Sequence, residues 1–330
     1  MKILDVTLRD GGFVNDFRLG LDDARAVVAL LDPAGLDGIE IGYLTGLPPN
    51  HGAYPHAGPC YALTPEHVAD LAAATTTPLV GMLHPGGTEP LDLPALAGAG
   101  LSLVRIPVTP NGDGRWHDVA DRLTRAAMPF TVNLTLASWA DPEAVEACAK
   151  TAESAGARMF YVADTNSAFL PDQVEEIFHR LSGTVGLPLG FHAHDCKRLA
   201  LANVLAARRG GAQWADASLA GLGRGAGNAA TEVLHEITGR DAEARHRLLL
   251  ALPEVTRAFE AYDARQLWQQ LCAFLDLWPP AIELFDKAEL RTGVDKYERA
   301  GTRLLGRELA HPPTEADLTA MTGLHPDGAG

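Results

Sequence analysis

The sequence contains few cysteines, and none of them are closely spaced. Cys60, Cys148, Cys196 and Cys272 are spread over 330 residues without a C-x-x-C pair. A disulfide framework or a zinc ribbon requires more cysteines at shorter and regular spacing. We therefore expect reduced thiols with structural roles.

Long apolar runs and an excess of basic residues are also missing. No run approaches the ~18 apolar residues of a membrane span, and the chain opens on Lys2-Ile3-Leu4-Asp5 without a charged-then-apolar leader. Lys and Arg number 27 against 42 Asp and Glu, a formal charge of −15, which argues against nucleic acid or an anionic membrane as the main partner. We expect a cytoplasmic protein that acts on a small molecule.

Short apolar runs alternate with amphipathic stretches through residues 1–240, the pattern of repeated β-α units. Eight units of this length predict an α/β fold, a (β/α)₈ TIM barrel whose active site lies at the carboxyl ends of its strands. A doubly wound sheet would normally stop at five or six strands. The predicted strands are Ile3–Leu8, Gly38–Tyr43, Leu79–Leu83, Leu101–Val108, Phe130–Ala137, Met159–Ala163, Leu187–His192 (or through His194) and Trp214–Leu219. The predicted helices are Asp22–Leu31, Pro65–Ala74, Leu93–Ala99, His117–Ala127, Pro142–Ala155, Asp172–Leu181, Leu199–Arg209 and Asn228–Ile237.

The alternation stops at Asp241. Arg257–Ala273 and Asp286–Leu305 read as helices, with the apolar segment Leu275–Phe285 between them. We expect a helical extension over residues 241–310 that packs on the barrel or on a second subunit of a homo-oligomer. Residues 311–330 are rich in proline and small residues, and we expect this tail to be poorly ordered.

Two histidines separated by one residue are the strongest local sign of chemistry. Alternate side chains of a strand point to the same face, so His192 and His194 converge on one spot. A neutral imidazole is the commonest protein ligand of a metal ion, and two of them leave room for a carboxylate from elsewhere. Alone, however, a His-x-His pair is also common in sites without a metal.

The end of the first predicted strand supplies that carboxylate. Asp10 follows Arg9 and precedes Gly11-Gly12, and in a closed barrel the first strand lies two places from the seventh. Asp10 can therefore meet both histidines as a metal ligand, unless it caps a turn. Arg9 is placed to stabilise an oxyanion of the substrate through charge-assisted hydrogen bonds, unless it forms a structural ion pair.

A glycine-rich loop follows the eighth predicted strand, from Gly221 to Asn228. Gly223 and Gly225 let the backbone approach an anionic group of the substrate, and a following helix would favour its charge. The loop lacks the acid of the dinucleotide-binding motif and lies at the wrong end of the fold for it. Asn228 either adds a neutral oxygen to the metal or caps the helix.

Further polar residues lie inside or at the ends of other predicted strands. Glu40 and the Asp164-Thr165-Asn166 segment are expected as partners of the histidines or of the substrate. Arg105 is a candidate clamp for a substrate carboxylate. For each of them a structural ion pair or cap is the alternative reading.

Three motifs together resemble the DRE-TIM metallolyases, most of all the 4-hydroxy-2-oxoacid aldolases. They are Asp5-Val6-Thr7-Leu8-Arg9-Asp10-Gly11, His192-Ala193-His194 and the segment from Asp216 to Ala229, and the resemblance spans Ile3 to Gly239 in the expected order. The Gly-Ala-Gly-Asn form of the last motif is closer to the aldolases than to the isopropylmalate and homocitrate synthases. The resemblance implies a divalent ion, Mn²⁺, Mg²⁺ or Co²⁺ and less commonly Zn²⁺, held by Asp10, His192 and His194, with Arg9 beside a pyruvate enolate.

The sequence departs from the aldolase pattern at the residues that handle protons. Phe13 stands where the aldolases have a catalytic histidine, and Cys196 where they have an asparagine. Tyr43, His84, a metal-bound water, Tyr262 and Tyr297 are the candidate replacements. As an apolar wall of the substrate pocket, Phe13 would favour an acceptor that is bulkier or less polar than a short aldehyde.

The sequence therefore predicts a divalent-metal-dependent aldolase that makes or cleaves a carbon–carbon bond next to a 2-oxo acid, with an aldehyde as the second substrate. One alternative is a Claisen-type acyltransferase that condenses an acyl-CoA with a 2-oxo acid. Another is a catalytically inactive scaffold barrel. An iron oxygenase also uses two histidines and a carboxylate, but those ligands normally lie on a β-sandwich.

Overall fold

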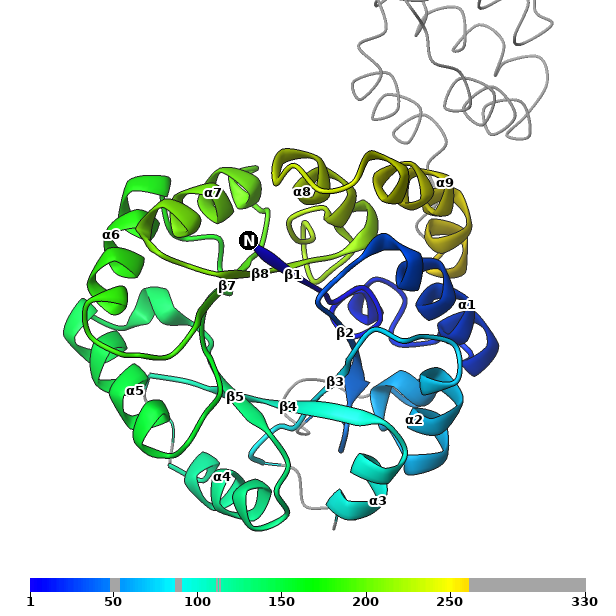
Figure 1. Ribbon diagram of the computed structural model, residues 1–330, viewed down its shortest axis with the longest axis horizontal. Coiled ribbons are helices and arrows are strands. Elements are labelled where there is room, and N and C mark those ends of the chain that lie inside the picture. The colour runs from blue at the N-terminus through cyan, green and yellow to red at the C-terminus, as the bar shows by residue number, and fades with distance from the viewer. Residues whose placement is uncertain (48–53, 87–90, 111, 113, 261–330) are drawn as a thin grey trace, which may run out of the picture. The chain divides into compact units, whose positions relative to one another are not determined.

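The computed structural model describes residues 1–47, 54–86, 91–110, 112 and 114–260. Its first compact unit, Met1–Arg245, is a closed barrel of eight parallel strands in sequence order, with helices around it, as predicted (Figure 1). The strands are β1 (Lys2–Asp5), β2 (Gly38–Tyr43), β3 (Leu79–Met82), β4 (Leu101–Val108), β5 (Phe130–Leu134), β6 (Phe160–Asp164), β7 (Leu189–Ala193) and β8 (Trp214–Ala217). The helices are α1 (Leu21–Leu31), α2 (Pro65–Ala72), α3 (Leu93–Gly98), α4 (Trp116–Arg125), α5 (Pro142–Ser154), α6 (Pro171–Ser182), α7 (Ala200–Gly210), α8 (Thr231–Ile237) and α9 (Ala242–Ala258).

The pairing of β1 with β8 closes the barrel. Lys2 lies opposite Trp214, and Asp5 lies opposite Ala217. Leu4, Val6 and Val80 form a buried apolar cluster with Leu103 and Trp214. Because β1 and β3 are not neighbours in the sheet, this cluster lies inside the barrel, and it is a packed core rather than a channel.

Local sequence accounts for several helix boundaries. At α2, the Thr64 hydroxyl accepts a hydrogen bond from His67 N at 3.3 Å, and Pro65 takes the first helical position, where its missing N–H costs nothing. Asp141 caps α5 in the same way through Ala144 N at 2.7 Å, with Pro142 following it. Both helices therefore start at a capping side chain that is followed by a proline.

Four strands (β1, β3, β5 and β8) end earlier than the apolar runs predicted, because loop residues at the mouth of a barrel can also be buried and apolar. β1 stops at Asp5, whose Oδ1 accepts a hydrogen bond from Thr7 N at 2.9 Å, and the chain then turns into a short 3₁₀ helix (Gly11–Val14). β5 stops before Leu136, which has a left-handed backbone with φ of 52°.

One helix start was predicted wrongly. α8 begins at Thr231 rather than at Asn228, because the segment before it pairs with the end of β7. Ala242–Ala258 is a helix at the start of the expected helical extension, where no individual helix was assigned before Arg257. The expected helices beyond residue 260, the apolar segment between them and the tail 311–330 lie outside the described residues.

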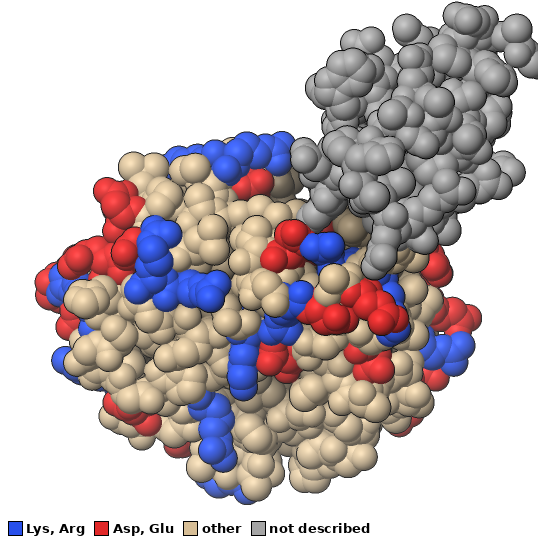
Figure 2. Space-filling model, turned by 45° about the horizontal axis from the view of Figure 1, so that its top comes forward, with Lys and Arg blue, Asp and Glu red and all other residues tan. Residues whose placement is uncertain are grey.

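On the face shown in Figure 2, Lys and Arg side chains lie among acidic side chains rather than in one basic patch. None of the helices in the described part of the chain has the length and apolar character needed to cross a membrane.

Two carboxyl groups are buried behind β1 and β8. Burial raises the pKa of Asp5 to about 6 and that of Glu232 to about 7. Asp5 accepts a hydrogen bond from the Thr231 hydroxyl at 2.6 Å, and Glu232 accepts one from Ala220 N at 3.1 Å, which ties α8 to the loop after β8. The folded state therefore favours the protonated acids.

This burial predicts a pH dependence of stability. A raised carboxyl pKa stabilises the folded state fully below the unfolded pKa, and that stability is lost as pH rises through the folded value. For Glu232 the loss runs from pH ~4.5 to ~7 and amounts to about 3 kcal/mol. Glu232→Gln, which mimics the protonated acid, should therefore be about as stable as the wild type at pH 4.5 and more stable at pH 8.

Urea unfolding of both proteins at the two pH values measures this difference. The exposed Glu176→Gln on α6 is the matched control and should show no such dependence. A Glu232→Gln variant that is less stable than the wild type at pH 8 would contradict the prediction.

Candidate active site

The three predicted metal ligands meet at the carboxyl-terminal mouth of the barrel. The potential ligand atoms of Asp10, His192 and His194 all lie within 4.8 Å of one another, and the three residues are buried. The two histidine Nε2 atoms are 3.3 Å apart. Two ligands that bind one ion at about 2.1 Å lie about 3.0–3.4 Å apart, so the pair has the spacing of two ligands of the same ion.

Asp216 orients the first histidine. Its Oδ2 lies 2.9 Å from His192 Nδ1, and an ionised carboxylate can only accept, so Nδ1 carries a proton and Nε2 is the nitrogen that faces His194. Sequence reasoning gave Asp216 no role. An aspartate within the otherwise apolar strand β8 was the available signal, since a buried charge on a strand needs a partner.

The protonation states suit a cation. Burial lowers the pKa of His194 to about 4, with a contribution from His192, so this imidazole is neutral at pH 7. Burial opposes ionisation of Asp10, but Arg9 and the two histidines outweigh it and hold the pKa of Asp10 well below its usual range. The imidazoles of His192 and His194 and the carboxylate of Asp10 together form a donor set suited to a divalent ion.

Asn228 completes one side of this site and does not cap a helix. Its Nδ2 donates to Asp10 Oδ2 at 2.7 Å and to Leu222 O at 3.1 Å. Its Oδ1 is buried and has no hydrogen-bond partner in the described structure. A buried oxygen of this kind normally has a ligand or a water, which is consistent with the predicted role of Asn228 as a metal ligand.

The glycine-rich loop brings Asn228 to Asp10. Its end pairs with the end of β7, where Asn228 bridges His194. A Cβ on Gly223 would lie 2.3 Å from Asn228 Nδ2 and 2.8 Å from Asp10 Oδ2, so the loop fits over the metal ligands only with glycine at this position. Gly223 thus serves close packing of the loop. The expected anion site at a helix start is not formed, because α8 begins only at Thr231.

Arg9 is fixed beside the metal site by two carboxylates. Its Nε donates to Glu40 Oε2 at 2.8 Å, and its Nη1 donates to Asp10 Oδ1 at 2.5 Å. Burial would lower the pKa of Arg9, but Glu40 and Asp10 more than offset this and raise it. Arg9 therefore stays charged and held in place, and it lines the pocket, where it can meet a substrate oxygen.

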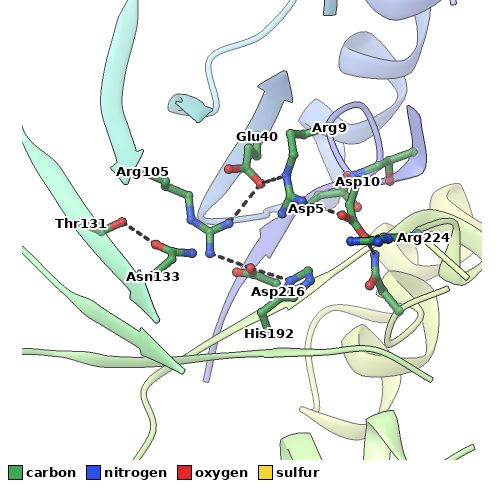
Figure 3. A network of polar contacts seen from close by, with 12 residues as sticks. Asp5, Arg9, Asp10, Glu40, Arg105, Thr131, Asn133, His192, Asp216 and Arg224 are labelled. Atoms are coloured by element: carbon green, nitrogen blue, oxygen red, sulfur yellow. Dashed lines mark hydrogen bonds and ion pairs between the residues drawn. The ribbon is translucent and has the colours of Figure 1, made fainter. Parts of the chain in front are cut away.

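Arg105 lies below the site rather than in the pocket, which differs from the expected clamp on a substrate carboxylate. It is fully buried, and it donates to Glu40 Oε2 at 3.1 Å and to Asp216 Oδ2 at 2.6 Å. With the Asn133 amide oriented to fit its neighbours, the Asn133 oxygen accepts from Arg105 Nε at 3.0 Å. Figure 3 shows the resulting chain of contacts, which runs from His192 through Asp216, Arg105 and Glu40 to Arg9.

Glu40 and Asp164 do not contact the histidines as expected. Glu40 joins Arg9 to Arg105, and it does not line the pocket described below. Asp164 accepts hydrogen bonds from Ala168 N at 2.7 Å and Phe169 N at 3.3 Å, and so shapes the loop after β6. Thr165, in contrast, lines the pocket, and its hydroxyl accepts a hydrogen bond from Leu136 N at 2.9 Å.

A pocket of about 320 Å³ opens above the metal ligands, next to an outer chamber of about 630 Å³. The two share Phe13, Leu136, Thr165, His194 and Arg224. The inner pocket also contains Arg9, Asp10, Tyr43, His84 and His192, and the outer chamber contains Tyr54, Trp139, Asn166, Cys196 and Gly225. Phe13 thus forms a wall common to both parts, and it packs edge-on against Phe17 with ring centroids 4.9 Å apart.

Of the proposed replacements for the missing histidine, two lie in the inner pocket. Burial raises the pKa of Tyr43, so its phenol stays protonated and can donate a proton but not accept one at neutral pH. His84, just beyond β3, is half-buried and lines the same pocket. Tyr262 and Tyr297 lie outside the described residues.

Comparison with known proteins agrees with this geometry. The HMGL-like family model matches residues 114–249. A 4-hydroxy-2-oxovalerate aldolase of Moorella thermoacetica is 36% identical over 71% of this chain and 69% of its own length. An oxaloacetate decarboxylase of Mycobacterium tuberculosis is 28% identical over 94% of this chain and 88% of its own length.

A solved structure shares the fold. The carboxyl transferase domain of Rhizobium etli pyruvate carboxylase superposes with a TM-score of 0.66 at 17% identity, over 99% of this chain and 66% of that one. This similarity concerns the architecture alone. The sequence relatives, together with the assembled Asp-His-His site, show that the chain belongs to the HMGL-like, or DRE-TIM, family of metal-dependent carbon–carbon lyases.

Proposed function

We propose that this chain binds a divalent ion through Asp10, His192, His194 and Asn228 and makes or cleaves the carbon–carbon bond next to the carbonyl group of a 2-oxo acid. The carrying observation is the assembly of the buried Asp-His-His cluster with the fixed guanidinium of Arg9 in one pocket. Mn²⁺, Mg²⁺ and Co²⁺ fit the mixed oxygen and nitrogen ligands, and the ion supplies a Lewis acid for the oxygens of the substrate.

The residues of the chain have separate tasks in this reaction. Arg9 donates a hydrogen bond to the oxygen that becomes negative as the enolate forms, and it needs no reorganisation because Glu40 already holds it. Phe13, Met82 and Leu136 exclude water from the inner pocket, which strengthens that interaction. His84 and the protonated Tyr43 are the side chains placed to move a proton at the second carbonyl group.

A second candidate reaction is the decarboxylation of a 2-oxo acid that carries a carboxylate on the carbon beyond the enolate. Phe13 in place of the catalytic histidine favours it, since loss of CO₂ needs no base. The C3–C4 bond breaks, its electron pair forms the enolate, CO₂ leaves, and C3 then takes a proton from solvent. The oxaloacetate decarboxylase relative covers nearly the whole chain.

One experiment detects the step that both reactions share. Proton NMR of pyruvate in deuterated water with the enzyme and Mg²⁺ should show exchange of the methyl protons, because exchange reports the enolate whatever the second substrate is. Release of free thiol from an acyl-CoA in the presence of a 2-oxo acid would instead indicate the Claisen-type acyltransferase. Tight metal binding without exchange or turnover would indicate an inactive scaffold.

Removal of one histidine tests the metal site directly. We expect His192→Ala and His194→Ala to lose bound metal and methyl exchange together while the barrel stays folded, because the site lies at the mouth of the barrel rather than in its core. Metal analysis, circular dichroism and the exchange assay measure the three properties. His56→Ala, at an exposed loop position outside both parts of the pocket, is the control. Full metal occupancy in both histidine variants would overturn the assignment.

A further inference from the structure

Arg224 places a cationic side chain at the mouth of the pocket. Its side chain is exposed, lines both the inner pocket and the outer chamber, and lies with Cζ 5.8 Å from the centre of the Phe13 ring. It forms no ion pair with any of the described residues. This differs from Arg9 and Arg105, each of which is bound by two carboxylates.

The described walls around Arg224 hold little negative charge. Among the described residues that line the inner pocket and the outer chamber, Asp10 carries a carboxylate. Arg9 already forms an ion pair with Asp10, and we assign Asp10 to the metal. The remaining described wall near Arg224 is aromatic or neutral, with Phe13, Tyr54 and Trp139. An unpaired guanidinium over an aromatic wall is a binding site for an anion with a planar group, and a carboxylate matches its fork of donors.

The position of Arg224 indicates which part of a substrate it would meet. Its backbone N lies 3.5 Å from Asp10 Oδ2, so the residue starts at the edge of the metal site, while its side chain borders the outer chamber. The first carboxylate and keto group of a 2-oxo acid belong at the metal ligands and Arg9. The group beyond the reacting bond then lies toward Arg224, which Figure 3 shows next to Asp10.

We propose, resting on the proposed function, that Arg224 determines specificity by binding a second carboxylate, so that the substrate is a 2-oxo dicarboxylic acid. This carboxylate is either retained on the second product or lost as CO₂. A carboxylate held by a guanidinium is stabilised in its charged form, which opposes its departure as neutral CO₂. The structure therefore favours retention, and the second product is itself an oxo acid rather than a neutral aldehyde.

The cleavage balances as a retro-aldol step. The C3–C4 bond breaks, the C4 hydroxyl loses its proton and becomes a carbonyl group, and the electron pair passes to the C3 enolate, which later takes a proton. The carboxylate on C4 keeps its charge and its contact with Arg224 throughout. The reverse reaction joins two oxo acids, and no other reactant is required.

A matched pair of substrates isolates the effect of the second carboxylate on the rate of cleavage. 4-Hydroxy-4-methyl-2-oxoglutarate and 4-hydroxy-2-oxopentanoate differ in that the first has a carboxylate where the second has hydrogen, and both release pyruvate, which a coupled assay measures. We expect the wild type to prefer the dicarboxylate. Arg224→Met should lower kcat/KM for the dicarboxylate about 10- to 100-fold, mostly through KM, and leave the monocarboxylate nearly unchanged, since a hydrogen bond to a charged group is lost.

Two further variants sharpen the result. Arg224→Lys keeps the charge but not the fork and should fall between the wild type and Arg224→Met. Arg198→Met removes an arginine whose side chain is 78% exposed and which does not line either part of the pocket, so it should leave the substrate ratio unchanged.

The outcomes separate the two proposals. Equal losses on both substrates, or no loss on either, overturn the role of Arg224, while methyl exchange of pyruvate in the wild type and in Arg224→Met keeps the proposed function. An absence of exchange in the wild type overturns the proposed function itself. Oxaloacetate decarboxylation that depends on Arg224, without cleavage of the dicarboxylate, overturns retention of the second carboxylate.

Discussion

Arg9→Ala should bind metal as the wild type does and lose about 10²–10³ in turnover, the usual cost of removing a preorganised donor to an oxyanion. The guanidinium touches Asp10 through Nη1, but His192 is oriented independently by Asp216. The metal ligands therefore keep most of their arrangement without Arg9, whereas the enolate oxygen loses its donor. Metal content and kcat for the active substrate measure the two effects separately.

Arg9→Lys is the informative companion. An ammonium group keeps the charge but cannot donate to Glu40, Asp10 and the substrate in the geometry of the guanidinium fork, so we expect rescue to be poor. Arg9→Ala with near-normal turnover would make Arg9 a structural partner of Glu40. Loss of metal in both variants would instead mean that Arg9 supports the metal site by fixing Asp10.

The convergence of the metal ligands could be predicted from the sequence because it follows from the regularity of the barrel. Alternation along β7 places Phe191 against Phe178 of α6, with ring centroids 5.6 Å apart, and turns His192 toward the interior. The closure of β1 against β8 then brings Asp10 to the histidines. Both arguments need only strand periodicity and strand order, which short apolar runs reveal.

The ion-pair partners could not be predicted in the same way. Arg105 contacts Glu40 across 65 residues and Asp216 across 111 residues of sequence. For each of these three residues the sequence allowed several ion-pair partners. Which of them meet depends on side-chain direction and on register shifts, such as the one between Glu40 and Gly42 in β2. The sequence indicated buried charges in the barrel. Only the structure shows that Arg105 holds Glu40 and Asp216 below the site, and that Arg224 lines the pocket.

The position of Asn228 shows a different limit. Asparagine directly before a helical pattern is a common cap, and the sequence could not separate this reading from a metal ligand. The structure excludes the cap through a tertiary contact, because pairing of the loop with the end of β7 delays α8 until Thr231. A local pattern does not contain this information.

Arg105→Met should be the most destabilising of the substitutions considered. It leaves Glu40 and Asp216 buried without their shared cation, and removal of one partner of a buried charge pair typically costs about 3–5 kcal/mol. Arg105 is fully buried and also lies over the Tyr161 ring at 4.4 Å, so a methionine restores part of the packing but none of the charge. Urea unfolding measures the loss, and Arg180→Met, which breaks a partly exposed pair with Glu143 and Glu146, should cost far less stability.

Arg105→Lys separates the effect of Arg105 on the position of the site residues from its effect on stability. The lysine keeps one positive charge between Glu40 and Asp216 but cannot donate to both of them as the guanidinium does. Glu40 fixes Arg9 and Asp216 fixes His192, so Arg105 connects the oxyanion donor to the metal ligand without contacting substrate. We expect the lysine variant to stay folded and to bind metal about 10–100-fold more weakly, the usual effect of disturbing a residue behind a metal ligand. Its kcat at saturating metal should also fall, since Arg9 is held less firmly. Metal affinity and saturated kcat equal to those of the wild type would show that Arg105 contributes to stability alone.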